Sequence, residues 1–141
     1  MKNFIINIRF VVALFFSFSL YGQESNPNIT KIDSLLKLVD SKSTSNSQID
    51  VLNQLSKTYL EIDYVKAEQY ASEAIKKSEL TNYKDGLADG YYHLAYSVYY
   101  TIDVKTSLDY YLKALKLFRE INKPKDEIAV LADIAYIYGD I

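Results

Sequence analysis

Apolar residues recur at helical spacing along most of this chain. Ile49, Leu52, Leu55 and Tyr59 follow one another at three or four residues, which places them on one face of a helix. No stretch shows the sustained alternation of apolar and polar residues that is typical of half-buried strands. The pattern therefore predicts an all-α fold, built from antiparallel helix pairs.

Polar runs divide the apolar pattern into segments. Residues 41–47 are a Ser-rich run, and Pro124 lies in a polar break near the end of the chain. The predicted segments are a flexible leader at 23–28, an N-terminal helix at 29–40, a Ser-rich loop at 41–47, and helix pairs at 48–81, 87–121 and, in part, 127–141.

Several residues suit the ends of these helices. Thr30 with Asp33, and Ser47 with Asp50, have the spacing of capping boxes. Asp63 and Asp103 are suitable N-caps for the second helix of each pair. Two glycines, Gly86 and Gly90, are expected to give the backbone conformational freedom in the turn at 82–86 and at the start of the helix that follows.

An apolar residue followed by a small one recurs about every forty residues. The spacings between successive pairs are 39 and 40. A fixed period of this size is typical of stacked units that bury their apolar faces against one another. The pairs are Leu55-Ser56, Leu94-Ala95 and Ile134-Ala135.

The last unit, 127–141, holds only one helix of its pair. We therefore expect a longer repeat protein, of which this chain is the truncated beginning. The helix would leave Leu131, Ile134 and Tyr138 without a partner helix. Each uncovered side chain lacks the stabilisation of about 1.5–3 kcal/mol that its burial would give. Self-association through this open end is the expected consequence when the chain is made alone.

Residues 1–22 have the features of a secretion signal. Lys2 and Arg9 give it a positive start, residues 10–20 form an apolar core, and Gly22 suits cleavage before Gln23. The core is shorter than the about 20 residues that cross a bilayer, so a cleaved signal is favoured over a retained anchor. We expect an exported protein of the periplasm or cell envelope.

Composition narrows the functional classes. The chain contains no cysteine, which excludes disulfides and a bacterial lipid anchor. Without Lys2 and Arg9 it carries 14 basic and 18 acidic residues, unlike a nucleic-acid-binding protein. The one histidine, His93, is interpreted as solvated or partly packed, since neither a zinc site nor a catalytic triad has its other members here. No enzyme, metal site or cofactor is expected.

The repeating residues resemble the tetratricopeptide repeat family. Its motif of large and small residues matches Tyr91, Leu94, Ala95, Ser107, Tyr111 and Ala114 in the middle unit. The first unit supplies Leu55, Ser56, Tyr59, Ala67 and Ala74, and the third supplies Ile134, Ala135 and Tyr138. The period near forty is longer than the family's usual 34 or so residues, and the usual proline after the second helix is missing. The resemblance implies an α-solenoid of stacked helix pairs.

In this family the first helices of the pairs line a concave groove. Four tyrosines of one helix fall on a single stripe, and tyrosine suits binding because it offers a large, rigid contact area. The alternative is that these tyrosines pack between neighbouring units. The groove residues implied by the resemblance are Asp50, Asn53, Lys57, Asp89, Tyr92, Tyr96, Tyr99, Tyr100 and Tyr136.

The resemblance implies a non-catalytic module that binds a protein or peptide and no nucleic acid. Long-period repeats behind a secretion signal look like the extracytoplasmic sensory or scaffold regions of larger bacterial signalling proteins. In those proteins a membrane tether and a histidine kinase or helix-turn-helix output follow, here beyond residue 141. The alternative is a free-standing periplasmic adaptor.

Overall fold

The computed structural model describes residues 26–39 and 45–139. These ranges contain six helices and no strand, which confirms the predicted all-α fold for this part of the chain. The predicted secretion signal at 1–22 lies outside the described residues, as do most of the predicted leader and of the predicted Ser-rich loop. The helices are α2 (Pro27–Val39), α3 (Asn46–Tyr59), α4 (Tyr64–Thr81), α5 (Lys84–Thr101), α6 (Val104–Glu120) and α7 (Pro124–Gly139).

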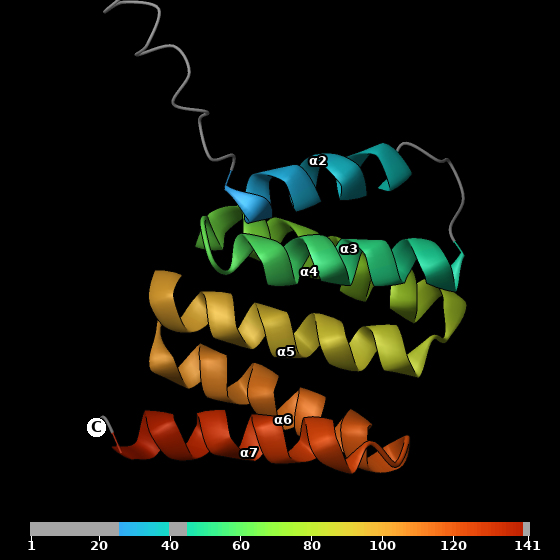
Figure 1. The fold of residues 1–141 in the computed structure, drawn as a ribbon. Helices are drawn as coiled ribbons and strands as arrows, with labels where there is room; N and C mark the ends of the chain where they lie inside the picture. Colours follow the sequence, from blue (N-terminus) through green and yellow to red (C-terminus); the bar gives the residue numbers. More distant parts are fainter. Residues whose placement is uncertain (1–25, 40–44, 140–141) are drawn as a thin grey trace, which may run out of the picture.

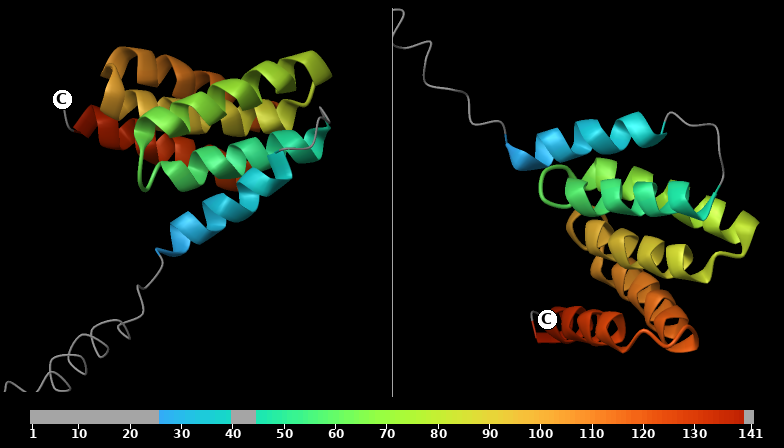
Figure 2. Two further views of the ribbon diagram at one scale, coloured as in Figure 1. Left: turned by 90° about the horizontal axis from the view of Figure 1, so that it is seen from above. Right: turned by 45° about the vertical axis from the view of Figure 1, so that its right-hand side comes forward.

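Each helix packs against the next one along the chain, and α3 also contacts α5. Figure 1 shows the helices stacked from α2 to α7, with α3, α5 and α7 on the near side and α4 and α6 behind them. The view from above in Figure 2 shows the same division. The helices α3, α5 and α7 therefore contribute to one common face.

Large side chains fill the space between helices, and small ones let the helices approach. Tyr111 and Phe118 of α6 are almost fully buried, and Leu55 of α3 is fully buried. Helix α4 lies between α3 and α5 and buries the small residues Ala71 and Ala74 completely. Large and small residues thus interdigitate, as close packing of helices requires.

A serine joins the two helices of each pair at equivalent places. Ser56 Oγ of α3 donates a hydrogen bond of 2.8 Å to the carbonyl oxygen of Ala67 in α4. In the next pair the roles are exchanged, and Ser107 Oγ of α6 donates to the carbonyl oxygen of Ala95 in α5, also at 2.8 Å. All four residues are fully buried. The same close contact is therefore made twice, with serine on opposite helices.

Helices α4 and α6 begin with the same cap, 40 residues apart. Asp63 Oδ1 accepts a hydrogen bond from the Lys66 amide at 3.1 Å, and Asp103 Oδ1 accepts one from the Thr106 amide at 2.8 Å. Both predicted N-caps are confirmed. Such a cap contributes about 1 kcal/mol.

The two helices also end alike. Asn82 and Asn122 adopt the left-handed conformation, with φ of 54° and 57°. The next amide, that of Tyr83 or Lys123, donates back to the carbonyl five residues earlier. Asparagine tolerates this conformation better than most residues. A left-handed asparagine therefore ends both helices.

Two predicted helix starts were wrong. Helix α2 begins at Pro27, because proline is favoured at the first helical position and Asn26 Oδ1 accepts the Asn28 amide at 2.9 Å. Thr30 therefore lies inside the helix. Helix α3 begins at Asn46, so Ser47 is helical too, and its hydroxyl shares a hydrogen bond with that of Ser45. Neither predicted capping box is present.

The glycines of α5 serve helix packing, which corrects the prediction of a turn at 82–86. The helix begins at Lys84, so Gly86 and Gly90 both lie within it. A Cβ atom on Gly86 would lie 2.6 Å from Ile49 Cγ2, and one on Gly90 would lie 2.8 Å from Ile75 Cγ1. Glycine is needed at these positions because neighbouring helices come too close for a side chain.

Helix α7 begins at Pro124, three residues before the predicted start at 127. Leu131 and Tyr138 are exposed, as expected of this helix, with exposed fractions of 40% and 66%. Ile134 is half-buried against the core cluster around Tyr111 and is only partly available. Self-association through this face stays a prediction.

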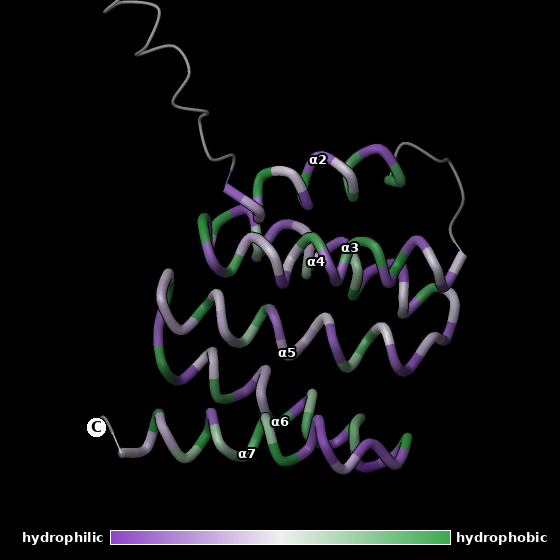
Figure 3. The backbone as a smooth tube through the Cα atoms, in the orientation of Figure 1, coloured by the Kyte–Doolittle hydropathy of each residue, from purple (hydrophilic) through white to green (hydrophobic). Residues whose placement is uncertain are grey.

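Hydrophilic residues interrupt the apolar ones on every helix that is drawn in Figure 3. Among the helices of the described ranges, none combines the length and the hydropathy needed to cross a bilayer.

We expect Gly86→Ala to destabilise the protein, since the new methyl group overpacks the contact with Ile49 at a cost of roughly 1–3 kcal/mol. Alanine regains about 1 kcal/mol over glycine inside a helix, so the expected net loss is up to about 2 kcal/mol. The measurement is urea denaturation followed by circular dichroism. Gly139→Ala is the matched control, because no atom lies within 4 Å of its added Cβ. Equal stability of the two variants would contradict the packing role of Gly86.

Candidate binding groove

Three hollows follow one another along the face that α3, α5 and α7 share. The first has a volume of about 460 Å³ and is called the acidic hollow here, because Asp50, Asp85, Asp89 and Asp126 line it. The middle hollow, of about 300 Å³, shares Lys57, Tyr92 and His93 with the first. The tyrosine hollow, of about 230 Å³, shares Tyr96 with the middle one. Because neighbouring hollows share lining residues, the three together are called the groove here.

All the candidate residues from the sequence lie along this groove. The acidic hollow is lined by Asp50, Asn53, Lys57, Asp89 and Tyr92. The tyrosine hollow is lined by Tyr96, Tyr99, Tyr100 and Tyr136. The structure brings these residues to a common surface; that they bind a ligand stays a prediction.

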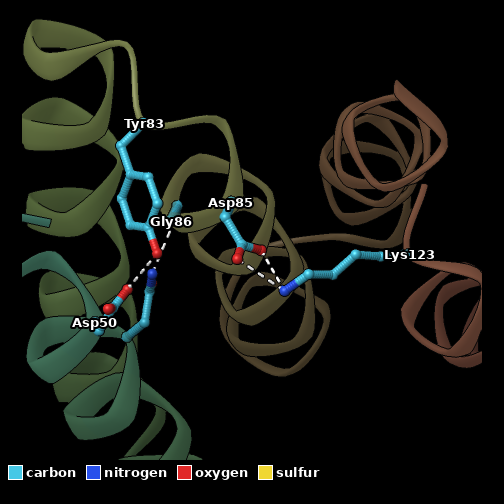
Figure 4. Close-up of polar contacts among 6 residues, drawn as sticks. Asp50, Tyr83, Asp85, Gly86 and Lys123 are labelled. Carbon is cyan, nitrogen blue, oxygen red and sulfur yellow. Dashed lines mark hydrogen bonds and ion pairs between the residues drawn. The ribbon is translucent and has the colours of Figure 1, made fainter. Parts of the chain in front are cut away.

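Hydrogen bonds between α3 and the start of α5 form one wall of the acidic hollow (Figure 4). The Tyr83 hydroxyl donates to Asp50 Oδ1 at 2.9 Å, and Asn53 Nδ2 donates to the carbonyl oxygen of Gly86 at 2.9 Å. On the other side, Lys123 Nζ lies 2.7 Å from Asp85 Oδ1. These contacts fix where the first turn of α5 lies relative to α3 and to the start of α7.

Burial and neighbouring carboxylates raise the proton affinity of Asp89 in this hollow. Burial raises the pKa of Asp89 to about 6, and the negative charge of Asp85 adds to the effect. Lys123 opposes the rise, but its ammonium is paired with Asp85. Burial and the hydrogen bond to Asp50 likewise raise the pKa of Tyr83 to about 12.

His93 is more deeply buried than the sequence suggested. It is only 7% exposed, although it lines both the acidic and the middle hollow. Burial, with a smaller contribution from the charge of Lys57, lowers the pKa of His93 to about 3. The imidazole is therefore neutral at physiological pH.

Aromatic rings stack on one another in the tyrosine hollow and beside it, where Tyr64 of the middle hollow meets Tyr100. The rings of Tyr64 and Tyr100 are parallel with centroids 4.5 Å apart, and Tyr99 meets Tyr100 edge to face at 4.9 Å. The hydrogen bond that the Tyr96 hydroxyl donates to Tyr100, together with burial, raises the pKa of Tyr96 to about 12. This hollow is thus a surface of aromatic rings with hydroxyl groups at their edges.

The burial of these tyrosines bears on both interpretations, packing between neighbouring units and contact with a ligand. Tyr92, Tyr96 and Tyr99 are half-buried and pack against the core cluster, as expected if they join neighbouring units. Tyr100 and Tyr136 are 49% and 63% exposed, so about half or more of each side chain is open to other contacts.

Several lining residues were not identified from the sequence. Asp85 and Asp126 lie in the first turns of α5 and α7, and the predicted starts at 87 and 127 excluded both. Tyr64 and Asp133 carry no repeat signal of their own. Correct recognition of proline at the start of α7 would have brought Asp126 into the helix.

Within the described ranges, no group of three or more histidine and acidic residues is arranged to hold a metal ion. Comparisons of the chain with protein-family models, with curated proteins and with solved structures find no match.

We expect Asp89→Asn to stabilise the protein at pH 7.5 by roughly 2 kcal/mol. Folded Asp89 keeps its proton up to pH about 6, whereas an unfolded aspartate loses it near pH 4, so its contribution to stability falls as the pH rises through this window. At pH 4 the substitution should have little effect. Thermal unfolding at both pH values tests this, with Asp109→Asn, on the exposed side of α6, as the control. Destabilisation by Asp89→Asn at pH 7.5 would contradict the argument.

Proposed function

We propose that this chain is a tetratricopeptide-like α-solenoid that binds an extended protein or peptide segment in the groove. The repeated caps and helix ends at 40-residue spacing support the repeat, as does the exchanged serine contact between α3–α4 and α5–α6. The groove along α3, α5 and α7 is the observation that carries the binding role.

The chemistry of the groove suits a peptide. Its two ends differ, since one offers carboxylates and the other offers tyrosine rings and hydroxyl groups. A peptide that lies along the face would meet both, and tyrosine contacts lose little conformational entropy on binding. The groove favours a peptide over a nucleic acid, because the four aspartates of the acidic hollow would repel phosphates.

We propose a non-catalytic role without a cofactor. A general base works best with a pKa near the working pH, and the pKa of His93 is lowered to about 3. Asp89 has a pKa near 6, but its neighbours in the hollow are other carboxylates and no nucleophilic serine lines that hollow.

The cellular role that we propose follows from residues 1–22. Their signal-like sequence supports an extracytoplasmic sensory or scaffold region of a larger bacterial signalling protein, with a kinase or helix-turn-helix output beyond residue 141. A free-standing periplasmic adaptor is the alternative.

Expression of the full chain in a bacterium with a Sec pathway should give a mature protein that begins at Gln23. Mass spectrometry of the intact protein from the periplasmic fraction tests this. A product that keeps residues 1–22 and stays in the membrane fraction would contradict the cleaved signal.

The groove is tested with a peptide selected from a phage-displayed random library against the full chain. We expect the double change Tyr100→Ala and Tyr136→Ala to weaken its binding about tenfold or more, because interface aromatic residues often contribute over 1 kcal/mol each. Removal of the Tyr100 ring also deletes its contacts with Tyr64 and Tyr99, each worth about 0.5–1.5 kcal/mol, so the melting temperature should fall, and the affinity is measured at a temperature where the variant is fully folded. Calorimetric titration gives the affinity.

Leu80→Ala, at a residue of α4 that is 74% exposed and does not line any of the three hollows, is the control and should bind as the wild type does. A library that yields no binder, or a peptide whose affinity is the same for the double variant, would contradict the proposed groove.

A further inference from the structure

The acidic hollow contains buried polar atoms that the protein itself does not satisfy. Asn53 is 3% exposed; its Nδ2 donates to Gly86, but its Oδ1 accepts no hydrogen bond within the described part of the chain. Nδ1 of His93 is likewise buried without such a partner. An unsatisfied buried acceptor costs about 1–3 kcal/mol, so Asn53 Oδ1 points to a donor supplied by a ligand.

The negative charge of the hollow indicates that the group supplying this donor is a cation. Of the four lining aspartates, only Asp85 forms an ion pair with a described residue, through Lys123. Asp50 accepts the Tyr83 hydroxyl, and Asp89 faces Asp50, Asp85 and Asp126. Lys57 is the one cation in the lining. An added cation would offset the remaining negative charge.

We propose that the acidic hollow is a specificity subsite that receives an arginine side chain of the bound peptide. This inference rests on the proposed peptide-binding function and adds the chemistry of one of its contacts. A guanidinium presents five N–H donors in a planar fork that matches carboxylate and amide oxygens. It also stacks on aromatic rings, and Tyr83 and Tyr92 line the same hollow.

The shape of the hollow favours a long side chain over a metal ion. Its volume of about 460 Å³ lies in the range of sites for small organic groups. No metal-binding arrangement of acidic and histidine residues exists among the described residues. A lysine would carry the charge, but its compact ammonium lacks the fork and the planar face of a guanidinium.

The unfavourable electrostatics fit a binding role. Asp89 is held among Asp85, Asp126 and Asp50, with Lys123 and Lys57 as the nearby cations and a neutral His93 on its own helix. Such a cluster opposes folding at neutral pH, and a bound guanidinium would relieve it. Binding therefore requires ionised Asp89 and should strengthen as the pH rises from 5 to 7.5.

The probe is N-acetyl-L-arginine amide, titrated into the full chain at pH 7.5 and followed by the backbone amide signals in nuclear magnetic resonance spectra. We expect saturable shifts at the start of α5 and around Asn53, with half-saturation in the millimolar range. N-acetyl-L-citrulline amide, which has nearly the same shape without the charge, should give no saturable shift. At pH 5 the arginine probe should bind several-fold more weakly.

Asp89→Asn should weaken binding of the arginine probe at least fivefold, although we expect this variant to be more stable than the wild type. Asp109→Asn changes the net charge equally and should leave binding unchanged. The inference is overturned if no saturable shift occurs, if N-acetyl-L-citrulline amide or N-acetyl-L-lysine amide binds as well as the arginine probe, or if Asp89→Asn has no effect. Failure here with successful peptide binding in the groove would leave the proposed function standing.

Discussion

The close approach of the two helices within each pair is the constraint on which the rest of this structure depends. Ser56 lies against Ala67, and Ser107 lies against Ala95. These residues are small, so the helix backbones come close enough for each serine hydroxyl to donate a hydrogen bond to a carbonyl oxygen of the other helix. A larger residue at any of these positions would separate the helices. Because the same contact recurs in successive pairs, α3 and α5 are presented side by side, and with α7 they line one groove.

The sequence predicts much of this arrangement because repeats, caps and small residues are local signals. Asp63 and Asp103 are predictable as caps from their positions alone, and the candidates that the family resemblance implies, such as Asp50, Asp89 and Tyr136, all line the groove. The helix starts were less predictable. The sequence around Gly86 predicts a turn, yet this residue lies inside α5. Glycine is present there because Ile49 of α3 lies too close for a side chain, which is a tertiary effect.

The same limitation explains what the sequence missed in the groove. Asp85 and Asp126 lie in the first turns of α5 and α7, and both helices start earlier than predicted. The predicted helices therefore did not include these two residues of the acidic hollow. The lowered pKa of His93 depends in part on Lys57 of α3, and the raised pKa of Asp89 depends in part on Asp50 of α3 and Asp126 of α7. Spacing along one helix does not reveal such neighbours. Consequently the position of the groove was predictable, but its charge pattern was not.

The groove combines a rigid support with an electrostatically unfavourable surface. Hydrogen bonds from Tyr83 and Asn53 hold the first turn of α5, while the aspartates gathered there repel one another. Groups with perturbed pKa values that crowd into one cleft are common at functional sites. A crystal structure of the full chain with a library-selected peptide tests this account most directly. We predict that the peptide lies along α3, α5 and α7; a peptide bound to the opposite face, on α4 and α6, would contradict the account.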